Sequence, residues 1–242
     1  MTVIHRLAQA LLVVALLAAG AALLFVATRR SPEDLPWTPL DPGRPIGLFT
    51  GRKLAALAED PAACRHFLDR AGIAYAVLPA RGEGECRAAD PVRLAVGGAR
   101  QVRLVPERPL LACPIAAVLA VWEWQIVQPA ARRHFGTRVA VIDHLGTYSC
   151  RRLYGRDSGA FSQHARANAI DVAGFRLADG RRVRVLQDWA GDDPAAKAFL
   201  RDVRDGGCRL FGTVLSPDYN AAHRDHLHLD QATRGAGWRA CR

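Results

Sequence analysis

The sequence SQHARANAID at residues 162–171 decides the fold, because a turn that carries potential ligands runs directly into a strand there. Residues 170–175 have the pattern of a β-strand that bears Asp171, and His164 falls on the turn before it. Downstream, the dipeptide DG at 179–180 lies between two strand-like runs and is a strong hairpin signal. The strand of Asp171 is therefore expected to pair with the strand that follows it.

A second motif, HRDHLHLD at residues 223–230, reads as another strand of the same sheet. His226 and His228 are two residues apart, and residues at this spacing face the same side of a strand. Apolar residues recur at helical spacing over 114–135 and 194–205. The sequence therefore predicts an α+β fold, in which a small antiparallel sheet carries these histidines and the aspartate and is packed by helices.

Together, His164, Asp171 and His228 offer a nitrogen, oxygen, nitrogen ligand set that suits zinc and leaves a fourth position open for water. Zinc held in this way lowers the pKa of its water towards 7 and polarises a carbonyl, as amide hydrolysis requires. His226 is placed to handle the proton. A His-x-His pair alone is weak evidence, since ordinary strands carry such pairs, but its combination with Ser162 and His164 is far more specific. We therefore predict a zinc hydrolase.

The combined pattern resembles the zinc metallopeptidases that cut bacterial cell-wall peptides, a group with lysostaphin, D-alanyl-D-alanine carboxypeptidases and the penicillin-insensitive murein endopeptidase. Their signature is Ser-x-His-x-x-Gly-x-Ala-x-Asp followed by His-x-His, and here Ala167 replaces the glycine. The resemblance implies that His226 acts as the acid and base beside the metal. The matching residues are Ser162, His164, Ala169, Asp171, His226 and His228.

Further side chains are expected around the metal. The carboxypeptidase branch carries Glu-x-x-His, and Asp225 stands where its glutamate would be; because aspartate reaches less far, we favour His226 as the base. Arg151 corresponds to an arginine near substrate in those enzymes and would bind a carboxylate or steady an oxyanion, with a structural salt bridge or a plain surface arginine as the alternative. Candidate substrate-binding residues are Ser162, Tyr219, Asn220 and His223, and Asp230 is the candidate for orienting a histidine ring.

A longer part of the chain, residues 46–242, resembles the bacterial extensin-like C-terminal domain family. Plant extensins are Ser-Pro-repeat glycoproteins, and no such repeat occurs here. The resemblance implies a domain of the same metallopeptidase type without establishing an activity. It rests on Cys86, the CP pair at 113–114, Trp122, QPAA at 128–131, YSCR at 148–151, the two site motifs, LSP at 215–217 and YN at 219–220.

The N-terminus is strongly apolar. Residues 10–28 carry no charge and just reach the roughly 20 residues that a membrane-spanning helix needs. We expect residues 1–30 to be a transmembrane anchor, with a cleaved signal peptide as the alternative because AGA at 19–21 resembles a cleavage site. The proline-rich stretch 31–45 predicts an extended linker, so the folded domain is expected over 46–242.

Six cysteines without a Cys-x-x-Cys pair favour disulfides in an oxidising compartment. Buried, reduced cysteines in a cytosolic protein are the alternative. We expect sequential pairing, which would give Cys64–Cys86, Cys113–Cys150 and Cys208–Cys241. Disulfides in the body place it outside the cytoplasm, so we expect a single-pass inner-membrane protein with its domain in the periplasm.

The chain has 33 basic and 23 acidic residues, a formal charge of +10, and nearly all the basic residues are arginines. This excess suits an anionic wall polymer, although a codon bias towards arginine and alanine would also produce it. Because the arginines are scattered and no recognition motif occurs, nucleic acid is not an expected partner. The predicted function is zinc-dependent cleavage of peptidoglycan peptides, of the D,D-carboxypeptidase or endopeptidase type. The alternative is a non-catalytic wall- or peptide-binding module that retains a structural metal.

Overall fold

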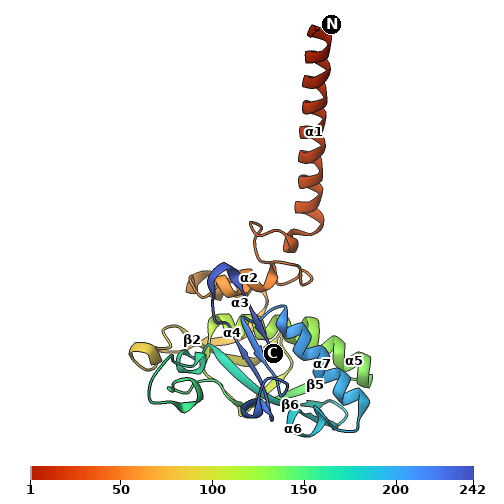
Figure 1. The fold of residues 1–242 in the computed structure, drawn as a ribbon. Coiled ribbons are helices and arrows are strands. Elements are labelled where there is room, and N and C mark those ends of the chain that lie inside the picture. The colour runs from red at the N-terminus through yellow and green to blue at the C-terminus, as the bar shows by residue number, and fades with distance from the viewer. Residues whose placement is uncertain (1) are drawn as a thin grey trace.

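The computed structural model describes residues 2–242, and its first element is the long helix α1 (Thr2–Arg30), which projects away from the rest of the molecule (Figure 1). Its apolar side chains are exposed. The stretch from Val3 to Arg30 is long and apolar enough to cross a membrane. The expected apolar N-terminal helix is thus present, and its length and composition fit either a membrane span or a signal sequence.

The proline-rich segment after α1 is attached to the domain rather than running as a free, extended tether. It contains a short turn, η1 (Pro32–Asp34). The Nζ atom of Lys53 donates hydrogen bonds to a carbonyl of η1 at 3.0 Å and to Thr38 Oγ1 at 2.8 Å, and Leu40 packs against the core. Residues 31–45 therefore contain little regular structure, but several contacts besides Lys53 hold them against the domain. The Leu48 N–H donates to Asp34 Oδ1 at 2.7 Å, and the Phe49 N–H donates to the Glu33 carbonyl at 3.0 Å.

Helices cover one side of the domain and follow the predicted positions. Asp60 accepts a hydrogen bond from the Ala63 N–H at 2.9 Å, so it caps the second short helix as its sequence indicates. The expected helix over 114–135 contains one π-helical turn, because Pro129 lacks the N–H that a regular helix needs there. The helices are α2 (Thr50–Ala56), α3 (Pro61–Arg70), α4 (Cys113–Trp122), the π-turn η3 (Glu123–Val127) and α5 (Gln128–Phe135).

Two sheets lie beneath these helices. The smaller is antiparallel, with strand order β1-β2-β4, and consists of β1 (Ile73–Val77), β2 (Pro91–Gly98) and β4 (Leu111–Ala112). The larger has seven strands in the order β10-β8-β9-β6-β5-β3, with β7 beside β6. Its members are β3 (Arg103–Val105), β5 (Val139–Gly146), β6 (Ala169–Leu177), β7 (Arg182–Arg184), β8 (Thr213–Leu215), β9 (Leu227–Asp230) and β10 (Ala240–Cys241).

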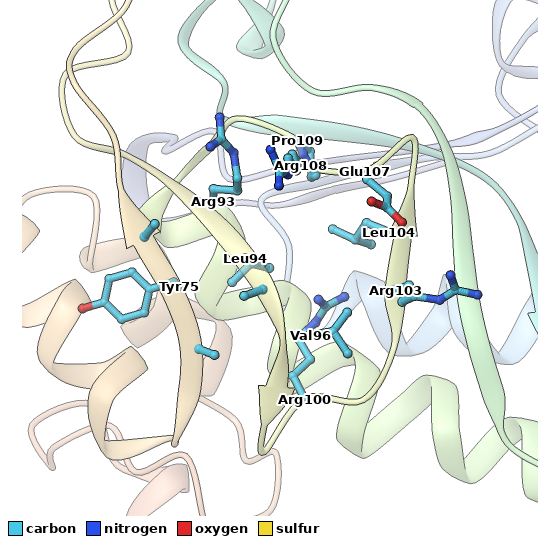
Figure 2. Close-up of a pocket in the computed structure, with 13 residues that line it drawn as sticks. Tyr75, Arg93, Leu94, Val96, Arg100, Arg103, Leu104, Glu107, Arg108 and Pro109 are labelled. Carbon is cyan, nitrogen blue, oxygen red and sulfur yellow. The ribbon is translucent and has the colours of Figure 1, made fainter.

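The centre of the larger sheet is antiparallel, which confirms the predicted class and the β6–β7 hairpin. The sheet is larger than expected, because short parallel strands are added at both ends: β3 beside β5, and β10 beside β8. The segment at 148–151 is irregular. In Figure 2, β2 and β3 follow one another in the chain yet separate into the two different sheets.

The core is centred on Trp122, which is fully buried and donates a hydrogen bond from Nε1 to the carbonyl of Val203 at 2.9 Å. Val203 belongs to α7 (Pro194–Cys208), which follows the short helix α6 (Val185–Asp188). Two consecutive glycines, at 206–207, lie within the last turn of α7, although glycine often marks the end of a helix. A Cβ atom on Gly206 would collide with the Ile126 side chain, so this glycine permits close packing instead of ending the helix.

All six cysteines form disulfides, as expected for an oxidising compartment: Cys64–Cys113, Cys86–Cys150 and Cys208–Cys241. The last pair was predicted correctly, whereas the predicted pairs Cys64–Cys86 and Cys113–Cys150 are wrong. The reason is helix packing, because α3 lies against the start of α4 and brings Cα atoms 49 residues apart to 6.1 Å. Cys86 therefore pairs with Cys150, in the segment before the site, and the Cα atoms of this pair are 5.3 Å apart.

Candidate metal centre

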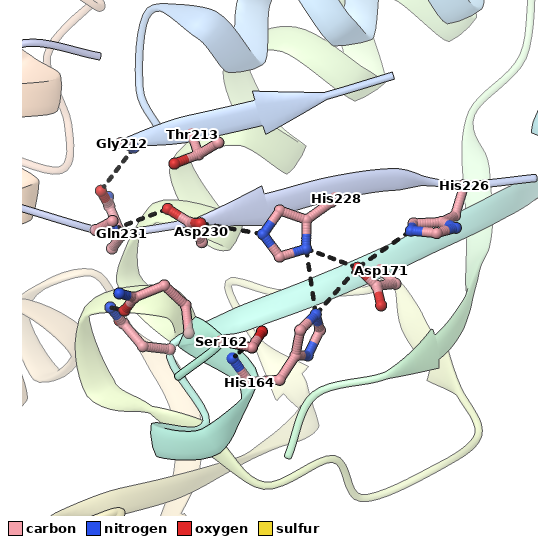
Figure 3. Close-up of polar contacts among 12 residues, drawn as sticks. Ser162, His164, Asp171, Gly212, Thr213, His226, His228, Asp230 and Gln231 are labelled. Carbon is pink, nitrogen blue, oxygen red and sulfur yellow. Dashed lines mark hydrogen bonds and ion pairs between the residues drawn. The ribbon is translucent and has the colours of Figure 1, made fainter. Parts of the chain in front are cut away.

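Three side chains from two adjacent strands and one turn converge at a single point on the larger sheet (Figure 3). Asp171 on β6 lies opposite His228 on β9 in the strand register, and His164 comes from η5 (Gln163–Arg166). The Asp171 Oδ1 atom is 3.1 Å from His164 Nε2 and 2.9 Å from His228 Nδ1, and these two nitrogens are 3.2 Å apart. The structure therefore brings together the three side chains that the sequence suggested as ligands.

The outer nitrogen of each ring is held by an acceptor. His164 Nδ1 lies 3.1 Å from the Thr147 carbonyl oxygen, and His228 Nε2 lies 3.0 Å from Asp230 Oδ2. A carbonyl can only accept, so Nδ1 of His164 carries a proton and its Nε2 directs a lone pair at the centre. If His228 donates a hydrogen bond from Nε2 to Asp230, its Nδ1 also directs a lone pair at the centre. Two facing lone pairs at 3.2 Å repel unless a proton or a cation lies between them.

Charge at the centre is set by burial and by these contacts. Burial opposes ionisation of Asp171, but its contacts with the His164 and His228 rings outweigh burial and hold the pKa of the carboxyl well below its ordinary value. Burial likewise opposes a charged His228, but Asp171 and Asp230 raise the pKa of its imidazole to about 9. Without metal, therefore, a proton fills the centre. The described residues fit a divalent cation in its place, because they supply one anionic and two neutral donors around one point.

The turn that supplies His164 is built by its neighbours. Ser162 Oγ accepts a hydrogen bond from the His164 backbone N–H at 3.3 Å, so this serine shapes the turn. Ala167 ends the turn in the left-handed region, with φ of 56°. The metallopeptidase signature has glycine at this position, and the left-handed backbone explains why glycine suits it.

His226 faces the same centre from the segment before β9. Its Nε2 lies 3.5 Å from Asp171 Oδ1, while its Nδ1 lies 2.8 Å from Asp225 Oδ1. Asp225 is 41% exposed and stands behind the imidazole, away from the cleft. The carboxylate therefore orients the ring, and an Nδ1–H donated to it leaves the His226 Nε2 lone pair directed at the metal centre.

His223 is buried beside this group. Its Nδ1 lies 2.8 Å from Asn220 Oδ1, and its ring lies between those of Tyr219 and His226, with centroids 5.5 and 5.2 Å away. Burial and the neighbouring rings of His226 and His228 lower the pKa of His223 to about 4. His223 is therefore neutral at ordinary pH, and Asn220 fixes its ring.

The metal centre opens into a cleft of about 440 Å³. Of the other predicted residues, Arg151, Ser162 and His223 line it, whereas Tyr219 and Asn220 stand behind its wall. No ion pair of Arg151 occurs in the described part of the chain, so its guanidinium is available to a ligand. The sequence reasoning missed further lining side chains that carry no motif of their own, among them Tyr154, Phe161 and Arg234.

The fold and site define an α+β domain with a candidate three-ligand metal centre on the face of an antiparallel sheet. The family model described as "Extensin-like protein C-terminus" matches residues 62–242, so the chain belongs to the extensin-like C-terminal family. No curated protein and no solved structure matches the chain.

Proposed function

We propose that this protein is a zinc-dependent hydrolase that cleaves peptide bonds in peptidoglycan. The observation that carries the proposal is the convergence of one buried carboxylate oxygen and two imidazole nitrogens within about 3 Å of each other, at the floor of an open cleft. Zinc in proteins takes such nitrogen and oxygen donors, and three protein ligands with an open position are typical of its catalytic sites. When bound, it supplies Lewis acidity to a carbonyl and to water.

Side chains of the cleft supply the remaining roles. His226 Nε2 accepts a proton from the water that attacks the peptide carbonyl and gives this proton to the leaving amine. Asp225 fixes the required tautomer through its contact of 2.8 Å with His226 Nδ1. Arg151 binds a carboxylate of the substrate or stabilises the developing oxyanion. Asp230 and the Thr147 carbonyl keep the two ligand rings in place.

The choice of peptidoglycan rests on two arguments. The site motifs match the signature of the wall-cutting zinc metallopeptidases, with Ala167 as the one departure at its fixed positions. In addition, Arg151 and Arg234 line the cleft, and the chain as a whole carries a charge of +10, which favours a substrate that bears carboxylates. Both arguments fit a D,D-carboxypeptidase and an endopeptidase.

A non-catalytic wall- or peptide-binding module with a structural metal is the second candidate. One observation favours it: the His223 ring centroid is only 6.0 Å from that of His228, so a small movement would offer the metal a fourth protein ligand. A closed site of four protein ligands is typical of structural zinc. Asn220 opposes this movement, because it holds His223 Nδ1.

We further propose that α1 anchors the chain in the inner membrane and that the domain lies in the periplasm. Three disulfides support an oxidising compartment, and α1 is apolar and exposed along its length. Peptidoglycan would then be within reach of the cleft.

The test is the metal content of the full-length protein, purified in detergent without chelator and measured by mass spectrometry. We expect about one zinc per chain in the parent and none in His164→Ala or His228→Ala. His66→Ala is the matched control, because His66 is exposed on α3. Circular dichroism shows whether each variant is folded. A folded parent without stoichiometric zinc, even after zinc is added back, would refute the proposal.

A further inference from the structure

A second cavity, of about 590 Å³, is lined by β1, β2, β3 and the loop after β3, and it shares no lining residue with the metal cleft. Figure 2 shows these two consecutive strands running in opposite directions on either side of it. β2 belongs to the three-stranded sheet, whereas β3 is the edge strand of the larger one. We call this cavity the β2–β3 groove. It is the place where the edges of two sheets face each other without pairing.

On the side of the groove both strand edges are free except at Gly97, whose N–H donates to the Arg100 carbonyl at 2.9 Å. β4 pairs only with Pro91 and Val92, so beyond Val92 the structure shows β1 on one side of β2 and no strand on the other in the described residues. β3 pairs with β5 along one edge only. An unpaired strand edge offers a row of backbone N–H and C=O groups to which an added strand can bond. The groove therefore offers such groups from both walls.

The groove is also cationic. Arg100 is matched by Glu123, with Nε 2.9 Å from Oε2 and both side chains 3% exposed. The other three arginines of the groove form no ion pair among the residues that the structure describes. In addition, Nε of Arg93 is buried without a hydrogen-bond partner, and a buried donor left unpaired is costly. The arginines that remain without a counter-charge are Arg93, Arg103 and Arg108, against the single acid Glu107.

We propose that the β2–β3 groove binds an extended, acidic peptide segment of a partner protein, which adds as a strand between β2 and β3. The peptide backbone bonds to the two free edges. Carboxylates of the peptide pair with Arg93 and Arg108, which lie together at one end of the groove in Figure 2. Because strand side chains alternate in direction, its apolar residues fall between the acids and cover Val96, which is 54% exposed.

An acidic peptide would bond to more of the polar groups of the groove than a small anion would. Inorganic phosphate would satisfy the guanidinium groups of Arg93 and Arg108 but leave both strand edges unbonded. Acidic side chains on an extended backbone satisfy both features at once. The proposal does not depend on the metal centre, because the two sites share no residue.

The test uses the full-length protein in detergent and a fluorescein-labelled short peptide in which valine and glutamate alternate, with binding followed by fluorescence anisotropy. We expect saturable binding that weakens as salt is added. Arg93→Glu and Arg108→Glu should each reduce the affinity about tenfold or more, as expected for loss of a charge-assisted hydrogen bond. Arg182→Glu, an exposed position on β7, is the matched control and should change the affinity less than about twofold.

Two further peptides separate strand addition from simple charge attraction. A version methylated at alternate backbone nitrogens keeps every carboxylate but cannot complete the edge hydrogen bonds, so we expect about tenfold weaker binding. The version with lysine for glutamate should not bind. The proposal is overturned if the glutamate peptide does not bind, if the methylated peptide binds equally well, or if phosphate displaces the peptide at equal concentration. Equal effects of the control and the groove variants would overturn it too. Unchanged circular dichroism shows that the variants are folded.

Discussion

The metal centre and the β2–β3 groove hold their polar groups in opposite ways. At the metal centre each outer ring nitrogen has an acceptor within 3.1 Å, and Asp171 contacts both ligand histidines. In the groove, Arg93 keeps a buried Nε without a partner. Metal ligands that are each held by a neighbouring group fix the position of an ion. A hydrogen-bond donor without a partner, beside free strand edges, requires a ligand that supplies hydrogen-bond acceptors. The metal centre therefore suits a small cation, and the β2–β3 groove suits an extended anionic chain.

The largest expected effect is the loss of the carboxylate ligand. Asp171→Asn should lower the zinc affinity by more than about a hundredfold, because the amide is neutral and a weaker donor. Asp230→Asn should lower it about 10- to 100-fold, the usual effect of a residue that orients a ligand. Competition with a fluorescent chelator measures both. Asp179→Asn, on an exposed turn, is the control and should leave the affinity unchanged; equal affinity of Asp171→Asn and the parent would contradict the assigned ligand set.

The next effect concerns the floor of the groove. Glu123→Gln leaves the buried guanidinium of Arg100 without its counter-charge and should lower the free energy of unfolding by about 3–5 kcal/mol. Replacement of both residues by apolar ones should recover most of this loss. Arg93→Met should be close to neutral, since it removes an arginine without an ion pair. Denaturant unfolding with intact disulfides measures all three, and a costly Arg93→Met would show that Arg93 is structural.

Both acid and alkali should destabilise the metal-free protein, each through a different histidine. The folded pKa of His228 is about 9, above its unfolded value of about 6.5, so its stabilising effect is complete below pH 6.5 and is lost as the pH rises through 9. The pKa of His223 is lowered to about 4, so stability is lost as the pH falls from 6.5 towards 4. Thermal unfolding of chelator-treated protein from pH 4 to 10 should therefore give a maximum near neutral pH.

His228→Gln separates the two limbs of this profile. In this variant the loss of stability above neutral pH, which is on the order of 3 kcal/mol in the parent, should disappear. The loss of stability below neutral pH should remain. An alkaline limb of the same depth in the variant would show that another group causes it.

The smallest effect is expected at Ala167. Glycine there relieves the left-handed strain, worth roughly 1–2 kcal/mol, but removes a buried methyl group worth about 0.8 kcal/mol. Ala167→Gly should therefore raise the melting temperature slightly or leave it unchanged. Ala165→Gly in the same turn is equally buried and has no strain to relieve, so it should lower the melting temperature. The same fall in both variants would contradict the strain argument.

The sequence predicted the metal centre because its donors lie in short motifs whose geometry is local. Strand periodicity predicts that His226 and His228 face one side, and both do face the metal centre, although β9 begins only at Leu227. The hairpin signal at 179–180 fixes one neighbour of the strand that carries Asp171. The carbonyl of Thr147 left no signal, since every residue has one. Two disulfide pairs were wrong because they depend on how α3 packs against α4.

The groove could not be predicted for a related reason. Its arginines come from β2, the following turn, β3 and the loop after β3, and only the separation of β2 and β3 into different sheets brings them around one space. Two consecutive strands usually pair with each other, so the sequence favours pairing of β2 with β3. In the structure these two strands belong to different sheets and do not pair. The buried Arg100–Glu123 pair likewise depends on long-range packing, with Glu123 on the π-turn of the central helix.

The most direct test of the proposed activity is cleavage of purified muropeptides by the zinc-loaded, full-length protein, compared with His226→Ala and analysed by liquid chromatography and mass spectrometry. We expect peptide-bond cleavage by the parent and a loss of at least about a hundredfold in the variant, with the zinc content of both unchanged. No cleavage by a parent that carries a full equivalent of zinc, or equal cleavage by His226→Ala, would contradict the proposed mechanism.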